Sequence, residues 1–88
     1  MKSKADKIVE SLEELTPINE QSFYHKALVL NKPNGDRTLY SYLTRIMTKK
    51  SDGSLVRHYD DWSWTTGRHI HAFCGLYKKD YDKLPLEV

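Results

Sequence analysis

The sequence is poor in the residues that disulfide-bonded, membrane-spanning or phosphate-binding proteins need. It has one cysteine, so no disulfide can form within the chain. Its four glycines stand singly, which excludes a glycine-rich phosphate loop. No apolar run approaches the roughly 20 residues that cross a membrane, and the first 15 residues carry four acids where a signal peptide is apolar. These absences predict a soluble, cytoplasmic protein that does not bind membranes.

The chain has only a small excess of charge of one sign, but it is not poor in aromatic residues. The net charge of +2 is too small to indicate a nucleic-acid partner by itself. Six tyrosines, two tryptophans and two phenylalanines supply the apolar area that a disordered chain lacks. A chain of 88 residues has room for one domain. We predict a single domain over residues 1–88, with an ordered core at about 4–78 and a frayed tail at 79–88.

The first predicted element is an amphipathic helix at residues 4–15. Pro17 ends it, because proline disfavours helical geometry in the residue before it. Its apolar residues recur at intervals of three and four, which places them on one helix face. They are Ala5, Ile8, Val9, Leu12 and Leu15.

Three predicted strands follow, at residues 23–31, 37–50 and 55–61. They are rich in aliphatic, β-branched and aromatic residues. Asn34-Gly35 and Asp52-Gly53 separate them and supply the positive φ angles that tight turns need. Two adjacent hairpins of this kind predict a three-stranded antiparallel β-meander.

A second helix is predicted to begin at Thr65 or Thr66, whose hydroxyl would cap its first turn. Gly75 weakens this helix by about 1 kcal/mol relative to alanine. The apolar residues at i, i+3, i+4 and i+7 form one stripe, and they are Ile70, Phe73, Cys74 and Tyr77. The predicted fold is α+β in two layers, with the meander flanked by an N-terminal and a C-terminal helix.

His69, His71 and Cys74 are the residues that suggest a metal- or cysteine-dependent site. On a regular helix His69 and His71 diverge by about 200°. Cys74 lies on the apolar stripe, where a thiol is buried and unreactive, and structural zinc usually needs four ligands. We therefore predict no catalytic residue, no metal and no cofactor, and this site is the least favoured alternative.

A nucleic-acid partner is suggested by the hairpin at residues 37–57, where five basic residues stand against Asp52 alone. Aromatic residues are interleaved with them, as in small β-sheet proteins that bind single strands. The opposing interpretation is a solvated turn beside tyrosines that are half in the core. The candidate residues are Arg37, Arg45, Lys49, Lys50 and Arg57.

Exposed aromatic residues favour a protein partner instead. Trp62 and Trp64 stand at a strand-to-helix corner, where a domain this small cannot bury both deeply. Tyr40 and Tyr42 would lie on a sheet left partly uncovered by the helices. Tryptophan and tyrosine dominate binding hot spots. The opposing interpretation is that one tryptophan closes the core and the other packs across the hairpin.

Two motifs resemble a family of small proteins encoded by phages and prophages of Gram-positive bacteria. The family pattern is Ser-Tyr-x-Thr-x-Ile, a polar turn, and then Ser-x-Thr-Thr-x-x-His-Ile-x-x-Phe. The chain departs from the family at Leu43, where glycine is frequent, and at Gly67, where a basic residue is common. The residues that match are Ser41, Tyr42, Thr44, Ile46, Ser63, Thr65, Thr66, His69, Ile70 and Phe73.

The resemblance implies a phage gene product that acts inside the infected cell, and no catalytic residues, because the family has no known function. It also implies that Ser63, Thr65 and Thr66 cap the second helix and that His69 bonds back to them. We predict a non-enzymatic interaction module that binds a host or phage protein or a second copy of itself. The alternative is a nucleic-acid-binding accessory protein that uses the hairpin at residues 37–57.

Overall fold

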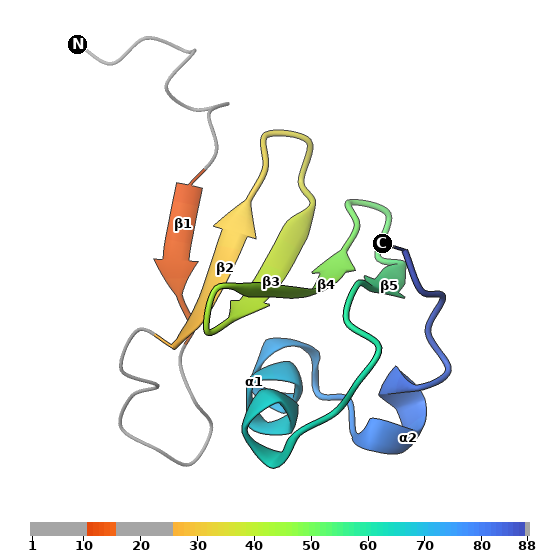
Figure 1. Ribbon diagram of the computed structural model, residues 1–88. Coiled ribbons are helices and arrows are strands. Elements are labelled where there is room, and N and C mark those ends of the chain that lie inside the picture. The colour runs from red at the N-terminus through yellow and green to blue at the C-terminus, as the bar shows by residue number, and fades with distance from the viewer. Residues whose placement is uncertain (1–10, 16–25, 88) are drawn as a thin grey trace, which may run out of the picture.

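The fold is a five-stranded antiparallel sheet followed by two short helices. The computed structural model describes residues 11–15 and 26–87. The strands lie in the order of the sequence, so each pairs with the next one along the chain. No helix among these residues is long and apolar enough to cross a membrane. Figure 1 shows the elements, which are β1 (Ser11–Glu14), β2 (Ala27–Asn31), β3 (Arg37–Ser41), β4 (Thr44–Lys49), β5 (Leu55–Arg57), α1 (Trp64–Cys74) and α2 (Lys78–Tyr81).

The predicted N-terminal helix is wrong at residues 11–14, which form a strand in the structure. Residues 11–14 form β1, which pairs with β2 so that Leu12 lies opposite Leu30. Leu15 extends the pairing, because its N–H donates to the carbonyl of Ala27 at 2.9 Å. Pairing with a neighbouring strand outweighs a helical pattern, since intrinsic helix preferences differ by less than about 1 kcal/mol per residue. Residues 4–10 of the predicted helix lie outside the described residues.

The predicted strand at residues 37–50 is two strands, β3 and β4, joined by a turn at Tyr42 and Leu43. These two residues have φ angles of 51° and 69°, and a two-residue hairpin turn requires positive φ at such positions. Glycine and asparagine usually occupy them, so this pair carries no recognisable turn signal. The three-stranded meander between two helices is therefore wrong, whereas the α+β class is confirmed.

The two predicted glycine turns are confirmed. Gly35 (φ 96°) lies between β2 and β3, and Gly53 (φ 90°) lies between β4 and β5. The N–H of Gly35 donates to the carbonyl of Lys32 at 3.0 Å, and that of Gly53 donates to Lys50 at 2.8 Å. Positive φ suits glycine because it has no Cβ to clash with the backbone.

Helix α1 is capped by Ser63, one of the three capping residues that the family resemblance implied, and by Gly75. The hydroxyl of Ser63 accepts the N–H of Thr66 at 3.0 Å, so the cap is Ser63 and the predicted start at Thr65 or Thr66 is late. Gly75 ends the helix in the left-handed conformation (φ 79°), and its N–H donates to the carbonyl of His71 at 2.8 Å. Tyr77 therefore lies beyond the helix and is exposed.

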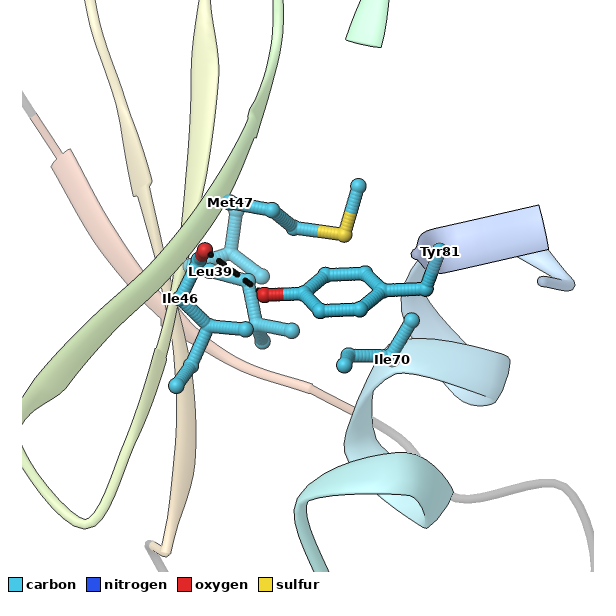
Figure 2. Close-up of a cluster of buried hydrophobic side chains, with 6 residues drawn as sticks. Leu39, Ile46, Met47, Ile70 and Tyr81 are labelled. Atoms are coloured by element: carbon cyan, nitrogen blue, oxygen red, sulfur yellow. Dashed lines mark hydrogen bonds between the residues drawn. The ribbon is translucent and has the colours of Figure 1, made fainter. Parts of the chain in front are cut away.

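The core lies between the sheet and the two helices, which cover the same face (Figure 1). A register shift in the β3–β4 ladder places Leu39 opposite Met47 but Tyr40 opposite Arg45, so Ile46 is an extra residue in β4. Ile46 and Met47 consequently both point into the core, although they are adjacent in a strand. Figure 2 shows the cluster that they form with Leu39, Ile70 and Tyr81.

The chain after residue 78 is part of this core, which corrects the prediction of a frayed tail. The Tyr81 side chain is completely buried, and its hydroxyl donates to the carbonyl of Tyr59. The same hydroxyl lies 3.3 Å from the carbonyl of Ile46 (Figure 2). Leu86 forms a parallel bridge with Arg57, whose carbonyl accepts the N–H of Glu87 at 2.7 Å. Residues 86–87 thus cover the free edge of β5.

Trp62 packs against the helix at a point where only glycine fits. A Cβ atom built on Gly67 would lie 2.5 Å from two carbon atoms of the Trp62 ring. The same ring also lies 5.5 Å from that of Tyr81, measured between centroids. Trp62 is therefore a packing residue that joins α1 to the tail.

The substitution Gly67→Ala is expected to destabilise the fold by about 1–3 kcal/mol, because the new methyl group displaces the Trp62 ring. Alanine favours a helix by about 1 kcal/mol over glycine, so an increase in stability would mean that the ring moves aside freely. Urea unfolding measures the difference. In a Trp62→Leu background, Gly67→Ala should no longer lower the free energy of unfolding. This comparison separates the contact with the Trp62 ring from other effects of the substitution.

Candidate functional site

His69 connects α1 to the sheet and is buried. Its Nδ1 atom lies 2.7 Å from the hydroxyl oxygen of Ser41 in β3, which corrects the implied bond back to the helix cap. Burial first, and then the positive charges of Arg68 and Lys26, lower the pKa of His69 to about 4. The ring is therefore neutral near pH 7. Because Ser41 is also buried, this pair is a structural link.

His71 and Cys74 point away from His69. The His71 ring stacks on Tyr77 with 4.6 Å between centroids. The Cys74 thiol lies 3.7 Å from the sulfur of Met47, and burial raises its pKa. Within residues 11–15 and 26–87, no three His, Cys, Asp or Glu side chains are grouped to hold a metal ion. The alternative of a shared metal or cysteine site at these three residues therefore has no geometric support.

Three of the five basic residues at 37–57 are paired with acids. Arg37 contacts Glu13 at 2.7 Å and Lys50 contacts Glu87 at 3.3 Å. Arg57 contacts Asp60 and also donates to the carbonyl of Leu84 at 2.9 Å. These pairs reduce the positive charge that the hairpin offers to a phosphate backbone. The partners come from β1, from the segment after β5 and from the tail.

The remaining two basic residues lie on different faces of the sheet. Arg45 is opposite Tyr40, whose side chain alternates with the buried Leu39 and therefore lies on the face without helices. Lys49 is opposite Arg37, which shares the helix side with Leu39. The predicted basic residues thus do not form one continuous surface.

The four predicted aromatic contacts separate into two packed and two exposed residues. Trp62 belongs to the core edge and Tyr40 is half-buried on the helix-free face. Trp64 and Tyr42 are exposed to 76% and 55% of their surface. Beside Tyr42, the aliphatic side chain of Leu43 is exposed to 82%. Exposed apolar side chains that gather in one place mark interaction sites.

Two cations lie over the two exposed aromatic rings. The Lys26 ammonium is 5.7 Å from the centroid of Tyr42, and the Arg68 guanidinium is 4.7 Å from that of Trp64. His69 is next to both pairs, because its ring is 6.0 Å from that of Tyr42 and it follows Arg68 directly in α1. We call this region the turn–helix surface, and it consists of Lys26, Tyr42, Leu43, Trp64 and Arg68.

The turn in this surface holds two bulky residues in a backbone conformation that disfavours them. Left-handed φ costs an L-residue roughly 1–2 kcal/mol, and both Tyr42 and Leu43 adopt it. Tyr42 gains contacts with Lys26 and His69. Leu43 gains little burial, because most of its side chain is exposed.

The sequence analysis predicted two residues of this surface, Tyr42 and Trp64, but not Lys26 or Arg68. The one sequence signal for Leu43 was the departure from a glycine that is frequent in the family.

Comparison with known proteins identifies a family for most of the chain. Residues 12–85 match a protein family of unknown function, DUF8033. The matched range contains β2 to β5 and both helices, and it begins one residue into β1. No curated protein and no solved structure matches the chain.

Proposed function

The chain belongs to DUF8033, a family of unknown function. We propose, from the exposed residues of the chain itself, that it is a non-enzymatic module that binds a protein partner through the turn–helix surface. Three of the residues in this surface are large, apolar and exposed: Tyr42, Leu43 and Trp64. Exposed aromatic residues near arginine are typical of binding hot spots.

The strained turn at Tyr42 and Leu43 is the observation that carries this proposal. Strain stored in a backbone is a reason to look for a function at that place. A glycine at position 43 would adopt the positive φ without strain and would also remove an exposed apolar side chain. The fold gains nothing evident from leucine there, whereas a partner that covers the turn would bury it.

A protein partner explains the surface better than the two alternatives. Nucleic acid would use the basic residues at 37–57, but acids pair with Arg37, Lys50 and Arg57. A catalytic or metal role would use His69 and Cys74, but the first is bonded to buried Ser41 and the second faces Met47. The phage origin and the cytoplasmic location that the sequence suggests stay predictions.

The substitution Leu43→Gly is expected to separate folding from binding. It should raise the free energy of unfolding by up to about 1 kcal/mol, because the strain of roughly 1–2 kcal/mol exceeds the entropy that glycine loses on folding, roughly 0.5–1 kcal/mol. Urea unfolding measures this. Peptides selected for binding from a displayed random library should lose at least about tenfold in affinity for the same variant.

The matched control is Leu12→Ala, which removes a side chain exposed to 59% in β1. It should leave the affinity of the selected peptides unchanged, whereas Trp64→Ala should lower it as Leu43→Gly does. A mass that rises with concentration for the wild type but not for Leu43→Gly would identify a second copy as the partner. If Leu43→Gly and Trp64→Ala bind every selected peptide as well as the wild type does, the proposal fails.

A further inference from the structure

The outer edge of β5 is occupied by the chain's own segment 85–87. The N–H of Arg57 donates to the carbonyl of Pro85 at 2.9 Å, and the carbonyl of Arg57 accepts the N–H of Glu87 at 2.7 Å. This bridge is parallel, whereas the five strands pair antiparallel. We propose that the edge is a strand-accepting site, where an extended segment of a partner protein replaces segment 85–87 in the same register. The proposal does not depend on the turn–helix surface.

Segment 85–87 can leave this edge without loss of the core. Tyr81 is buried and Leu84 packs against the core cluster, so both anchor the chain before the segment begins. All three residues of the segment are exposed, so little apolar area holds them in place. Lys50 contacts Glu87 at 3.3 Å in an exposed ion pair, which contributes little to stability. The segment is therefore held mainly by hydrogen bonds that a partner can replace.

The groups that bind an extended segment stay on the sheet when segment 85–87 leaves. The Nδ1 atom of His58 donates to the carbonyl of Glu87, because a carbonyl oxygen only accepts. The Thr48 hydroxyl holds the same ring from its other side, with its oxygen 2.7 Å from Nε2. The Lys50 ammonium lies beside the carboxylate of Glu87. A partner segment with an acidic residue at this position would meet both the His58 donor and the Lys50 charge.

Segment 85–87 leaves part of the edge unused. In a parallel ladder in this register, the next hydrogen bond would run from the N–H at position 85 to the carbonyl of Leu55, two residues before Arg57 in β5. Pro85 has no N–H, so the chain cannot make this bond with its own segment. A partner segment with any other residue at that position has the donor and extends the ladder. The edge therefore suits such a partner better than it suits its present occupant.

A capped peptide of sequence Asp-Lys-Leu-Thr-Leu-Glu tests this site. It copies residues 82–87 except that threonine replaces Pro85, and amide NMR shifts of residues 50–58 follow its binding. It should bind the full-length variant Glu87→Pro at least about tenfold more tightly than the wild type. This variant lacks the N–H that holds segment 85–87 to Arg57, so the edge is vacant more often. The same peptide with proline retained should bind about threefold more weakly or worse.

Two methylated peptides are matched controls for the register. Methylation of the backbone nitrogen of the last residue removes the N–H that pairs with the Arg57 carbonyl, and should weaken binding at least about tenfold. Methylation of the nitrogen of the preceding leucine removes an N–H that points away from β5, and should change the affinity by less than about twofold. Both can be measured on the wild type at higher peptide concentration, so this comparison does not depend on the folding of a variant.

A charge reversal tests the acidic position. In the Glu87→Pro background, Lys50→Glu should weaken binding at least about threefold. Lys32→Glu makes the same charge change at the exposed turn between β2 and β3 and should have no effect. Leu43→Gly should also leave the affinity of this peptide unchanged, which separates the edge of β5 from the turn–helix surface. Circular dichroism of each variant confirms that it is folded.

Three results would overturn the proposal. The first is equal affinity of the two methylated peptides, which would mean that the peptide does not pair with β5. The second is equal affinity of the wild type and Glu87→Pro for the unmethylated peptide, which would mean that segment 85–87 does not compete with it. The third is a mass that rises with concentration for the wild type but not for Glu87→Pro, which would assign the edge to a second copy of the chain.

Discussion

Replacing Tyr81 by alanine is expected to lower the free energy of unfolding by about 3–5 kcal/mol, the range for removing a buried aromatic side chain. That loss is a large part of the total stability of a small domain. The Tyr81 ring is buried in the cluster with Ile46 and Ile70 (Figure 2). Its centroid lies 5.5 Å from that of the Trp62 ring. Without it, the sheet and α1 lose the side chain that fills the space between them.

The conservative variant Tyr81→Phe tests whether the hydroxyl contributes separately. It keeps the ring and should cost about 1–2 kcal/mol, because the partly buried carbonyl of Tyr59 loses its donor. The Ile46 carbonyl is less affected, since it also accepts the N–H groups of His58 at 2.7 Å and Tyr59 at 3.2 Å. Burial raises the pKa of Tyr81 to about 12, so the donor stays protonated throughout the useful pH range.

Urea unfolding of both variants, with Tyr77→Ala as the matched control, measures these effects. Tyr77 is four residues away and exposed. Equal stability of Tyr81→Ala and Tyr77→Ala would show that the tail does not close the core. A graded loss from Tyr77→Ala through Tyr81→Phe to Tyr81→Ala is the expected order.

Acid is expected to destabilise the protein through His69 before its carboxyl groups are protonated. The ordinary pKa of 6.5 applies to the unfolded chain, and the folded value is about 4. Between these values the unfolded chain binds a proton that the folded chain does not, so stability falls as the pH is lowered through this window. Integrating this difference in bound protons over pH lowers the free energy of unfolding by about 2 kcal/mol between roughly pH 7 and pH 5, since each pKa unit corresponds to about 1.4 kcal/mol.

The control for the acid effect is the variant His69→Leu, measured by urea unfolding at both pH values. It should be less stable near pH 7, because Ser41 loses its partner, but its stability should change little between the two pH values. His58→Gln should keep the wild-type dependence. The pKa of Glu13 is lowered by its hydrogen bonds to Asn31 and Arg37, so this residue also costs stability in acid, but mainly below about pH 5 and thus outside this window. A wild-type protein whose stability is unchanged at pH 5 would contradict the prediction.

Much of the fold follows from local sequence signals, and its exceptions have physical causes. The turns at Gly35 and Gly53 were predictable because glycine adopts positive φ readily. The turn at Tyr42 and Leu43 was not, because bulky residues occupy the same region only under strain. The tail was not predictable either, since Tyr81 is a single residue without periodicity and its partners lie in β4 and beside β5.

The candidate site was predictable only in part. Tyr42 and Trp64 follow from the scarcity of places to bury aromatic residues in a small domain. Trp62 looked similar to Trp64, and the signal that distinguishes them is Gly67, whose missing side chain makes room for the Trp62 ring. The basic hairpin was misleading because its acidic partners, such as Glu13 and Glu87, lie far away in the sequence.

The order of the strands in the sheet also has a consequence for the kinetics of folding. Strands β2 to β4 each pair with the next strand in the sequence across a short connection, and such local contacts form rapidly. Tyr81 reaches Ile46 across a separation of 35 residues, so its insertion requires a much longer loop to close. We expect the sheet to assemble first and the tail to insert last. Until Tyr81 inserts, Leu39 and Met47 are covered less completely, and we expect the protein to be most prone to aggregate at this stage.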